Sequence, residues 1–155
     1  IMKKETTIFL AQEKDTLSLG HKLSEKLPQG FLVFLKGDLG AGKTTLVRGL
    51  VGALGHIGRV KSPSYNLIEQ YQLNDINLNH IDLYRFRSPQ EWVAAGFNEF
   101  INDSEITIIE WAEKAKGVLC EPDIIIEILY EKKGGRQATI YSFSEKGIKY
   151  CSDLI

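Results

Sequence analysis

Residues 31–50 read FLVFLKGDLGAGKTTLVRGL, an apolar run followed by a glycine-rich turn and a second partly apolar segment. The run FLVFL, residues 31–35, is too short for a helix and suits a strand that is buried on both faces of a sheet. Residues 37–44, GDLGAGKT, match the pattern G-x-x-x-x-G-K-[ST] at every position. Residues 43–54 then have the pattern of a helix that ends at Gly55. The segment therefore predicts a strand, a phosphate-binding loop and a helix in succession.

Each part of this loop has a chemical role toward a nucleoside triphosphate. Glycine permits backbone angles at which the amide groups can surround an anion. A helix that begins at Lys43 points its unpaired N–H groups and its positive dipole end at the same phosphates. Lys43 supplies a positive charge for the terminal phosphates, and the Thr44 hydroxyl is placed to bind Mg²⁺. The predicted nucleotide-binding residues of the loop are Gly37, Asp38, Leu39, Gly40, Ala41, Gly42, Lys43, Thr44 and Thr45.

Strand and helix patterns alternate on both sides of the loop. A strand is expected over residues 5–10, and Asp15 is expected to cap a helix that runs to about Leu27. Further strands are expected over residues 65–71, 76–81, 105–109, 123–131 and 137–144, with short helices after Ser88 and over 97–101. This order predicts an α/β fold that is P-loop NTPase-like, with a mostly parallel central sheet flanked by helices and a C-terminal antiparallel hairpin. No linker or repeat divides the sequence, so residues 1–155 are expected to form a single domain.

Composition and charge narrow the range of functions. The 155 residues are 43% hydrophobic and 25% charged, which are ordinary proportions for a globular domain. The net charge of −1 provides no general field for binding a nucleic-acid backbone. The two cysteines, Cys120 and Cys151, indicate neither a disulfide framework nor a metal site. With no apolar run near the roughly 18 residues of a membrane span and no targeting signal, we expect a soluble, cytoplasmic protein with no membrane partner.

A P-loop enzyme also needs a carboxylate at the end of a neighbouring strand, to hold the metal or to orient water. Two candidates are present: Asp82 follows the run INLNHI, and Glu110 follows the run ITII. The second run is the more hydrophobic, so Glu110 is preferred on the metal side, directly or through water, and for polarising the attacking water. The guanine-reading motif [NT]KxD is absent, which argues against a GTPase of the Ras type.

Four segments in a fixed order resemble one known family. They are GDLGAGKTT at 37–45, SPSY at 62–65, HIDLYR at 80–85 and IEW at 109–111. Together they resemble the bacterial TsaE (YjeE) family of ATPases, which serves the biosynthesis of N6-threonylcarbamoyladenosine in tRNA. The resemblance implies ATP and Mg²⁺ as cofactors and the proteins TsaD and TsaB as partners, which transfer a threonylcarbamoyl group to adenosine 37 of certain tRNAs. It further implies that ATP hydrolysis resets the TsaD–TsaB assembly, and that tRNA is contacted only indirectly through that complex.

The resemblance also assigns roles to residues outside the loop. Asp82 and Glu110 match the two acidic positions of the family, and Trp111 matches the aromatic residue beside the nucleotide. Residues 62–65, SPSY, match a switch-like segment of the family. Ser64 stands where the family usually has threonine, and its hydroxyl retains the chemistry for a contact with phosphate or Mg²⁺. The predicted catalytic residues are Lys43, Asp82 and Glu110, the metal-side residues are Thr44 and Glu110, and Ser64 and Trp111 are expected beside the nucleotide. Which acid holds Mg²⁺ and which orients water is left open.

Two other functions share the same loop. A small-molecule or nucleoside kinase usually has an arginine-bearing lid, whereas this chain has only five arginines and no evident second phosphate-binding cluster. A non-hydrolysing, ATP-gated binding module would use ATP to order residues 62–71. We expect instead Mg²⁺-dependent hydrolysis of ATP to ADP and phosphate. It should be slow in the isolated protein, because no arginine finger is evident, and stimulated by partners.

Other conspicuous residues are expected to have structural roles. His80 is predicted to form a local hydrogen bond within its strand. Lys132, Lys133 and Arg136 are predicted to form the solubilising tip of a hairpin. For Arg85, a contact with phosphate and a place in a solvated loop are equally favoured.

Overall fold

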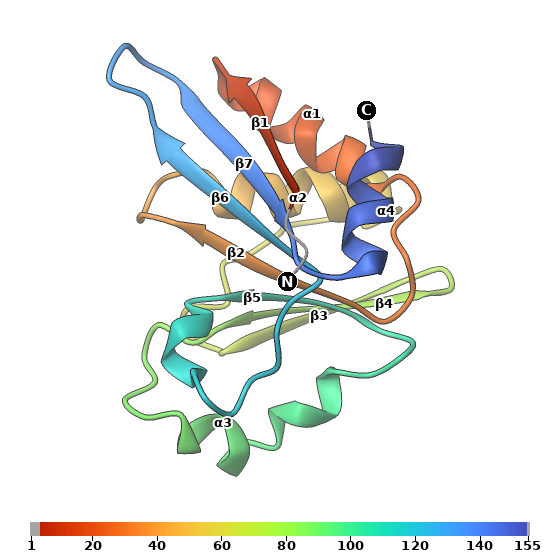
Figure 1. The fold of residues 1–155 in the computed structure, drawn as a ribbon, viewed down its shortest axis with the longest axis vertical. Coiled ribbons are helices and arrows are strands. Elements are labelled where there is room, and N and C mark those ends of the chain that lie inside the picture. Colours follow the sequence, from red (N-terminus) through yellow and green to blue (C-terminus); the bar gives the residue numbers. More distant parts are fainter. Residues whose placement is uncertain (1–3, 155) are drawn as a thin grey trace.

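The computed structural model describes residues 4–154, which form a seven-stranded sheet with helices on both faces (Figure 1). The strand order across the sheet is β1-β7-β6-β2-β5-β4-β3. The strands are β1 (Lys4–Leu10), β2 (Phe31–Gly37), β3 (Ile68–Leu73), β4 (Ile76–Asp82), β5 (Ile106–Glu110), β6 (Ile124–Tyr130) and β7 (Arg136–Ser142). The helices are α1 (Glu13–Ser24), α2 (Lys43–Ala53), α3 (Gln90–Ala94) and α4 (Glu145–Asp153), with short 3₁₀ helices η1 (Phe97–Phe100) and η2 (Ala112–Ala115). None of the helices within residues 4–154 has the length and hydrophobicity of a membrane span.

Parallel pairing occupies the centre of the sheet. β2 pairs in parallel with both β5 and β6, and β5 pairs in parallel with β4. Antiparallel pairs lie on either side, β6 with β7 and β7 with β1 on one flank and β4 with β3 on the other. The predicted α/β fold, with a mostly parallel central sheet and a C-terminal hairpin formed by β6 and β7, is therefore confirmed. The hairpin does not form the edge of the sheet, because β1 pairs with the outer side of β7.

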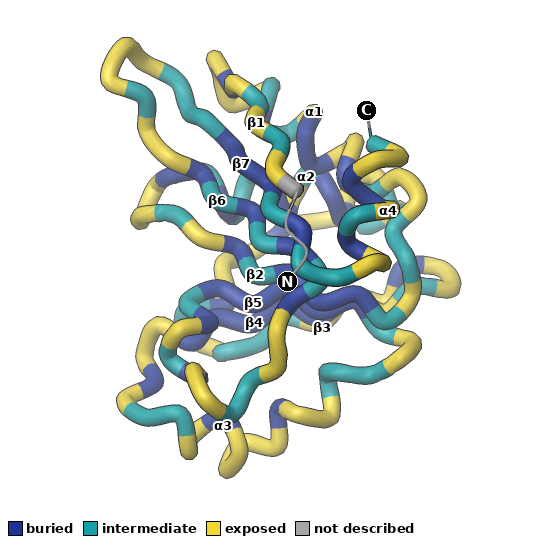
Figure 2. Tube along the Cα trace, viewed as in Figure 1, coloured by how far each residue is buried: buried dark blue, intermediate teal, exposed yellow. Residues whose placement is uncertain are grey.

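Alternate residues of β2 contribute to two separate hydrophobic cores. Phe31, Val33 and Leu35 belong to the core under α1, α2 and α4, whereas Leu32 belongs to the core under the segment from α3 to η2. Successive side chains of a strand point to opposite faces, so a strand covered on both faces is apolar throughout. This explains the continuous apolar run in the sequence. Figure 2 shows continuous burial along β5 and over residues 78–82 of β4, in the middle of the molecule.

Helix α1 begins three residues earlier than the sequence predicts, since its N-cap is Gln12 and not Asp15. Asp15 lies inside its first turn, where its carboxylate accepts a hydrogen bond from the Gln12 amide (2.8 Å). An acidic residue in the first turn stabilises a helix through the dipole as well as through hydrogen bonding. The helix is present, but the prediction that Asp15 caps it is wrong.

Two further differences concern segments that depend on tertiary contacts. β3 begins at Ile68, later than predicted, because the Leu67 amide donates to the Pro63 carbonyl (2.8 Å) and the intervening residues form a turn. No element was predicted after β7, yet α4 follows it directly. Its Tyr150 is buried against the Phe31 ring, with ring centroids 4.9 Å apart, so α4 completes the cover of one face of the sheet.

The carboxyl ends of β2, β5 and β4 lie next to one another in the sheet. β2 leads into the glycine-rich loop, β4 ends at Asp82 and β5 ends at Glu110. Glu110 is in register with Leu35 of β2 on one side and with Asp82 of β4 on the other. Ligands of open α/β sheets bind at this edge of the strands. The fold therefore brings the loop and both predicted acids together.

Candidate functional site

The loop between β2 and α2 has the form of an anion cradle. Gly40 and Gly42 have φ angles of +79° and +107°, in the left-handed region that strains residues with a side chain. Gly42 directly precedes α2, whose first turn contains no acidic side chain. The positive end of the helix dipole therefore faces the loop without compensation from α2 itself, which suits a phosphate group.

A pocket of about 430 Å³ opens beside this loop. Its volume lies within the range of small-molecule sites. The predicted residues that line it are Leu39, Gly40, Gly42, Lys43, Thr44, Thr45, Ser64, Asp82, Glu110 and Trp111. Gly37 and Asp38 line an adjoining pocket of about 300 Å³ instead, and Ala41 is fully buried. The structure thus gathers most of the predicted site from four separate segments of the chain.

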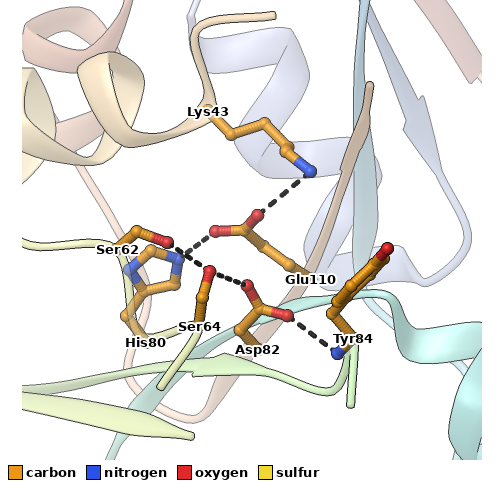
Figure 3. Close-up of polar contacts among 7 residues, drawn as sticks. All are labelled: Lys43, Ser62, Ser64, His80, Asp82, Tyr84 and Glu110. Carbon is orange, nitrogen blue, oxygen red and sulfur yellow. Dashed lines mark hydrogen bonds and ion pairs between the residues drawn. The ribbon is translucent and has the colours of Figure 1, made fainter. Parts of the chain in front are cut away.

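A chain of buried groups connects the loop with β5 and β4 (Figure 3). Lys43 Nζ lies 3.1 Å from Glu110 Oε1, and His80 Nε2 lies 2.6 Å from Glu110 Oε2. The exposed fractions of Lys43, His80 and Glu110 are 7%, 0% and 3%. Burial by itself would raise the pKa of Glu110, but the interactions with His80 and then with Lys43 outweigh burial and lower it. Glu110 is therefore a carboxylate at neutral pH, and both of its oxygens are held in place.

Asp82 is held by a different set of partners. Ser64 Oγ donates to its Oδ2 (3.1 Å), and the Tyr84 amide donates to its Oδ1 (2.8 Å). Ser62 Oγ lies 2.8 Å from Ser64 Oγ, so the switch-like segment is tied to the end of β4 (Figure 3). Burial, with help from the nearby Glu110 carboxylate, raises the pKa of Asp82 although the two hydrogen bonds oppose the rise. The environment thus shifts the pKa values of the two neighbouring acids in opposite directions, a pattern typical of sites that divide acid and base roles.

Aromatic side chains line the same pocket. Lys43 Nζ lies 5.1 Å from the centroid of the Trp111 ring, and the Tyr84 ring meets Trp111 edge-on at 5.1 Å. Trp111, directly after β5, has a φ angle of +59°, a left-handed conformation that is uncommon for a bulky residue and is often found at functional sites. The Arg85 guanidinium lies 4.4 Å from the centroid of the Tyr65 ring. Arg85 therefore lines the pocket, with its charge placed over an aromatic face.

Residues 10–138 match the family model described as "Threonylcarbamoyl adenosine biosynthesis protein TsaE". The chain belongs to the TsaE family. It is 42% identical over 129 residues to the tRNA threonylcarbamoyladenosine biosynthesis protein TsaE of Haemophilus influenzae, covering 80% of this chain and 82% of that relative. It is 41% identical over 145 residues to the protein of the same name from a Nostoc species, covering 90% and 87% of the two chains. The resemblance found in the four sequence segments is thereby confirmed.

The fold also matches a solved structure. The crystal structure of YdiB from Bacillus subtilis superimposes with a TM-score of 0.86, covering 99% of this chain and 96% of that one. The two sequences are 24% identical, so this likeness concerns the fold alone. The likeness of fold covers almost the whole chain.

The site contains side-chain oxygens of the kind that bind Mg²⁺ in proteins. Residues 4–154 contain no group of three or more His, Cys, Asp or Glu side chains that could hold a metal ion. Mg²⁺ in nucleotide sites usually has one or two protein ligands and takes its remaining ligands from phosphates and water. Thr44 and Glu110 line one pocket and supply oxygens of this kind. The residues therefore fit Mg²⁺ that arrives together with a nucleotide.

Two residues of this TsaE-family chain have contacts that the sequence did not predict. His80 was expected to bond locally, whereas it contacts Glu110 on the next strand, 30 residues along the chain. His80 and Asp82 are two residues apart on β4 and so share a face of the sheet, which was the available signal. Arg136 was expected at a solvated hairpin tip, whereas its guanidinium contacts carbonyl groups of the glycine-rich loop. No local pattern indicates the contact of Arg136.

Proposed function

We propose that this protein is a Mg²⁺-dependent ATPase that hydrolyses ATP to ADP and phosphate in support of N6-threonylcarbamoyladenosine modification of tRNA. The observation that carries the proposal is the meeting of Lys43, at the start of α2, with Glu110, at the end of β5, beside an anion-binding loop. A lysine, a hydroxyl and a strand-end carboxylate around such a loop are the parts that P-loop enzymes use for phosphoryl transfer. Membership of the TsaE family supports the biosynthetic role.

The loop and Lys43 bind the triphosphate. The loop amides and the N-terminus of α2 stabilise negative charge on the phosphates. Lys43 exchanges the Glu110 carboxylate for a phosphate oxygen when the nucleotide binds. The Thr44 hydroxyl and the Glu110 carboxylate, directly or through water, are the groups that hold Mg²⁺. When bound, Mg²⁺ supplies positive charge that offsets the charge on the transferred phosphoryl group.

The two acids have environments suited to different tasks. Glu110 is kept ionised by His80 and Lys43, which suits a group on the metal side. Asp82 has a pKa raised by burial and is tied through Ser64 to the switch-like segment. A carboxylate with a raised pKa is the better proton acceptor, so we assign Asp82 the orientation of the attacking water.

Partner proteins would supply the contact with tRNA and would raise the rate of ATP hydrolysis. The net charge of −1 favours contact with tRNA through a complex, which the family resemblance names as TsaD–TsaB. We propose that ATP turnover resets that complex, in the cytoplasm. Hydrolysis by the protein alone should be slow, because Arg85 in the pocket is packed on Tyr65 rather than directed as a finger at phosphate. Such a finger is worth about 10³–10⁵ in rate in other P-loop enzymes.

The test is turnover of Mg·ATP by the purified protein, alone and with TsaD and TsaB from the same organism. We expect slow basal hydrolysis that rises with both partners and is lost in Lys43→Ala. Lys149→Ala is the matched control, since Lys149 is an exposed lysine on α4. Tight ATP binding without turnover, even with both partners present, would contradict hydrolysis and favour an ATP-gated binding module.

A further inference from the structure

Two side chains of the β6–β7 hairpin contact the glycine-rich loop. Arg136 donates from Nε to the Ala41 carbonyl (3.2 Å) and from Nη2 to the Gly40 carbonyl (3.3 Å). The Tyr130 hydroxyl donates to the Leu39 carbonyl (3.3 Å). Three successive carbonyls of the loop are thus bound by side chains that lie 91 to 96 residues away in the sequence.

The neighbouring strands fix Arg136 in this place. Arg136 is directly opposite Tyr130 in the β6–β7 register, and its guanidinium lies 4.1 Å from the centroid of the Tyr130 ring. On its other side, Arg136 is opposite Leu10 at the end of β1. Gly135 approaches β1 so closely that a Cβ atom there would lie 2.8 Å from the Leu10 carbonyl oxygen. Arg136 therefore extends from a three-stranded frame and is not part of a free hairpin tip.

Binding these carbonyls orients the amide groups of the loop. In a trans peptide, the C=O of one residue and the N–H of the next residue point in opposite directions. With the Leu39 and Ala41 carbonyls turned to the hairpin, the N–H groups of Gly40 and Gly42 are directed away from it. Gly40 and Gly42 line the nucleotide pocket. The remaining N–H of this run, that of Ala41, donates within the loop to the Asp38 carbonyl (3.0 Å).

We propose that Arg136, assisted by Tyr130, is a positioning residue for phosphate binding. Arg136 pairs with β6 and β1 and contacts the glycine-rich loop, but it does not line the 430 Å³ pocket. It therefore acts through the shape of the loop. The inference rests on the proposed function, namely that the loop binds a triphosphate. A glycine-rich loop that is already held in its binding shape loses less conformational entropy when the ligand binds. Arg136 thus raises the affinity for any triphosphate, whatever base it carries.

The experiment compares three variants that separate charge from geometry. Arg136→Lys keeps the charge but loses the two-pronged donor, Arg136→Met loses both, and Tyr130→Phe keeps the ring but loses the hydroxyl. The dissociation constants of ATP and of inorganic tripolyphosphate, each with Mg²⁺, are measured by titration calorimetry. We expect both Arg136 variants to bind either ligand about tenfold more weakly, as for the loss of a hydrogen bond from a charged donor. Tyr130→Phe should show a smaller loss for both ligands.

Two further readouts separate positioning from a general loss of folding. The KM for ATP should rise in the Arg136 variants while kcat at saturating ATP is retained, whereas a smaller folded fraction would lower kcat alone. Lys133→Ala, on the exposed turn of the same hairpin, is the control and should bind both ligands as the wild type does. If an Arg136 variant fails to fold, Tyr130→Phe decides, and unchanged affinity in that variant would overturn the proposal.

Other outcomes would also overturn it. Wild-type affinity in Arg136→Lys would assign the effect to charge rather than to the geometry of the two bonds. A loss for ATP but not for tripolyphosphate would place Arg136 at the nucleoside, in the 160 Å³ pocket that it lines together with Thr16. Absence of binding by the wild type would refute the proposed function itself. That result differs from equal binding by the wild type and the Arg136 variants, which would refute only the role of Arg136.

Discussion

Glu110 is a buried carboxylate with a separate partner for each of its oxygens. Lys43 holds one oxygen and His80 the other. Removing one partner of a buried charge leaves that charge partly uncompensated, which destabilises the folded state. We therefore predict that His80→Leu lowers the free energy of unfolding by about 1–3 kcal/mol, measured by urea denaturation at neutral pH. His21→Leu, at an exposed position on α1, should change it by less than about 0.5 kcal/mol, and equal effects of the two substitutions would contradict the prediction.

Asp82 should give the stability of the protein a distinctive dependence on pH. Its pKa in the folded state is raised above the ordinary value of 3.8, first by burial and then by Glu110. The folded state therefore binds this proton more tightly than the unfolded state does, and the stability it contributes is lost as the pH rises through the raised pKa. Asp82→Asn removes this titration. We predict that Asp82→Asn gains stability relative to the wild type as the pH rises from 3.8 to neutrality.

The measurement for Asp82 is urea denaturation of both proteins at several pH values, with a chelator and without nucleotide. Hydrogen bonds that are lost or changed in Asp82→Asn shift its free energy of unfolding, relative to that of the wild type, by an amount that does not depend on pH. Only the change of that difference with pH is used. A difference that stays constant over the range would show that Asp82 titrates as an ordinary surface acid.

Helices α1 and α2 pack backbone against backbone, and two glycines make this approach feasible. A Cβ atom on Gly20 would lie 2.3 Å from the Leu46 carbonyl oxygen, and one on Gly49 would lie 2.4 Å from the Leu17 carbonyl oxygen. We predict that Gly20→Ala and Gly49→Ala each destabilise the protein by about 1–3 kcal/mol, because backbone cannot yield as a side chain can. Gly52→Ala, on α2 but facing open space, should instead stabilise it by about 0.5–1 kcal/mol. Chemical denaturation measures the free energy of unfolding of all three variants. Destabilisation by Gly52→Ala would show that the close packing of the two helices is not the cause of the losses at Gly20 and Gly49.

Helix α4 shows why some elements were not predictable from the sequence. Its first turn contains Gly147, and glycine lowers helix propensity. A Cβ atom at Gly147 would lie 2.1 Å from the Asp123 carbonyl oxygen, so the close packing of α4 against the start of β6 requires glycine. The contact that stabilises the helix in the fold thus selects a residue that weakens the helical signal. Helix α2 was predictable, because its own residue pattern and the phosphate-binding loop before it both indicate a helix at that place.

The nucleotide pocket joins four segments that the chain order separates: the loop, the switch-like segment, the end of β4 and the end of β5. A ligand that binds only the assembled pocket stabilises the whole fold, by about 2.7 kcal/mol at a concentration of 100 times Kd. We predict that Mg·ATP at that concentration raises the Tm by about 5–10 °C, measured by scanning fluorimetry. Lys43→Ala should show no shift at the same ATP concentration, and Lys149→Ala should show the full shift. A full shift in Lys43→Ala would place the ATP elsewhere.

Features that depend on neighbouring residues in the chain could be predicted from the amino-acid sequence. The strand, loop and helix from residue 31 to residue 53 could be predicted, because the glycine, lysine and apolar residues that specify them lie close together in the sequence. Asp82 and Glu110 could be predicted as well, because an acid after a buried strand must lie at the carboxyl edge of the sheet. The contact of His80 with Glu110 and the contact of Arg136 with the loop could not be predicted, because each joins residues from different strands or loops. Both contacts depend on which strands lie side by side in the sheet. The strand order is β1-β7-β6-β2-β5-β4-β3, and such an order results from the packing of the whole sheet and not from any local sequence pattern.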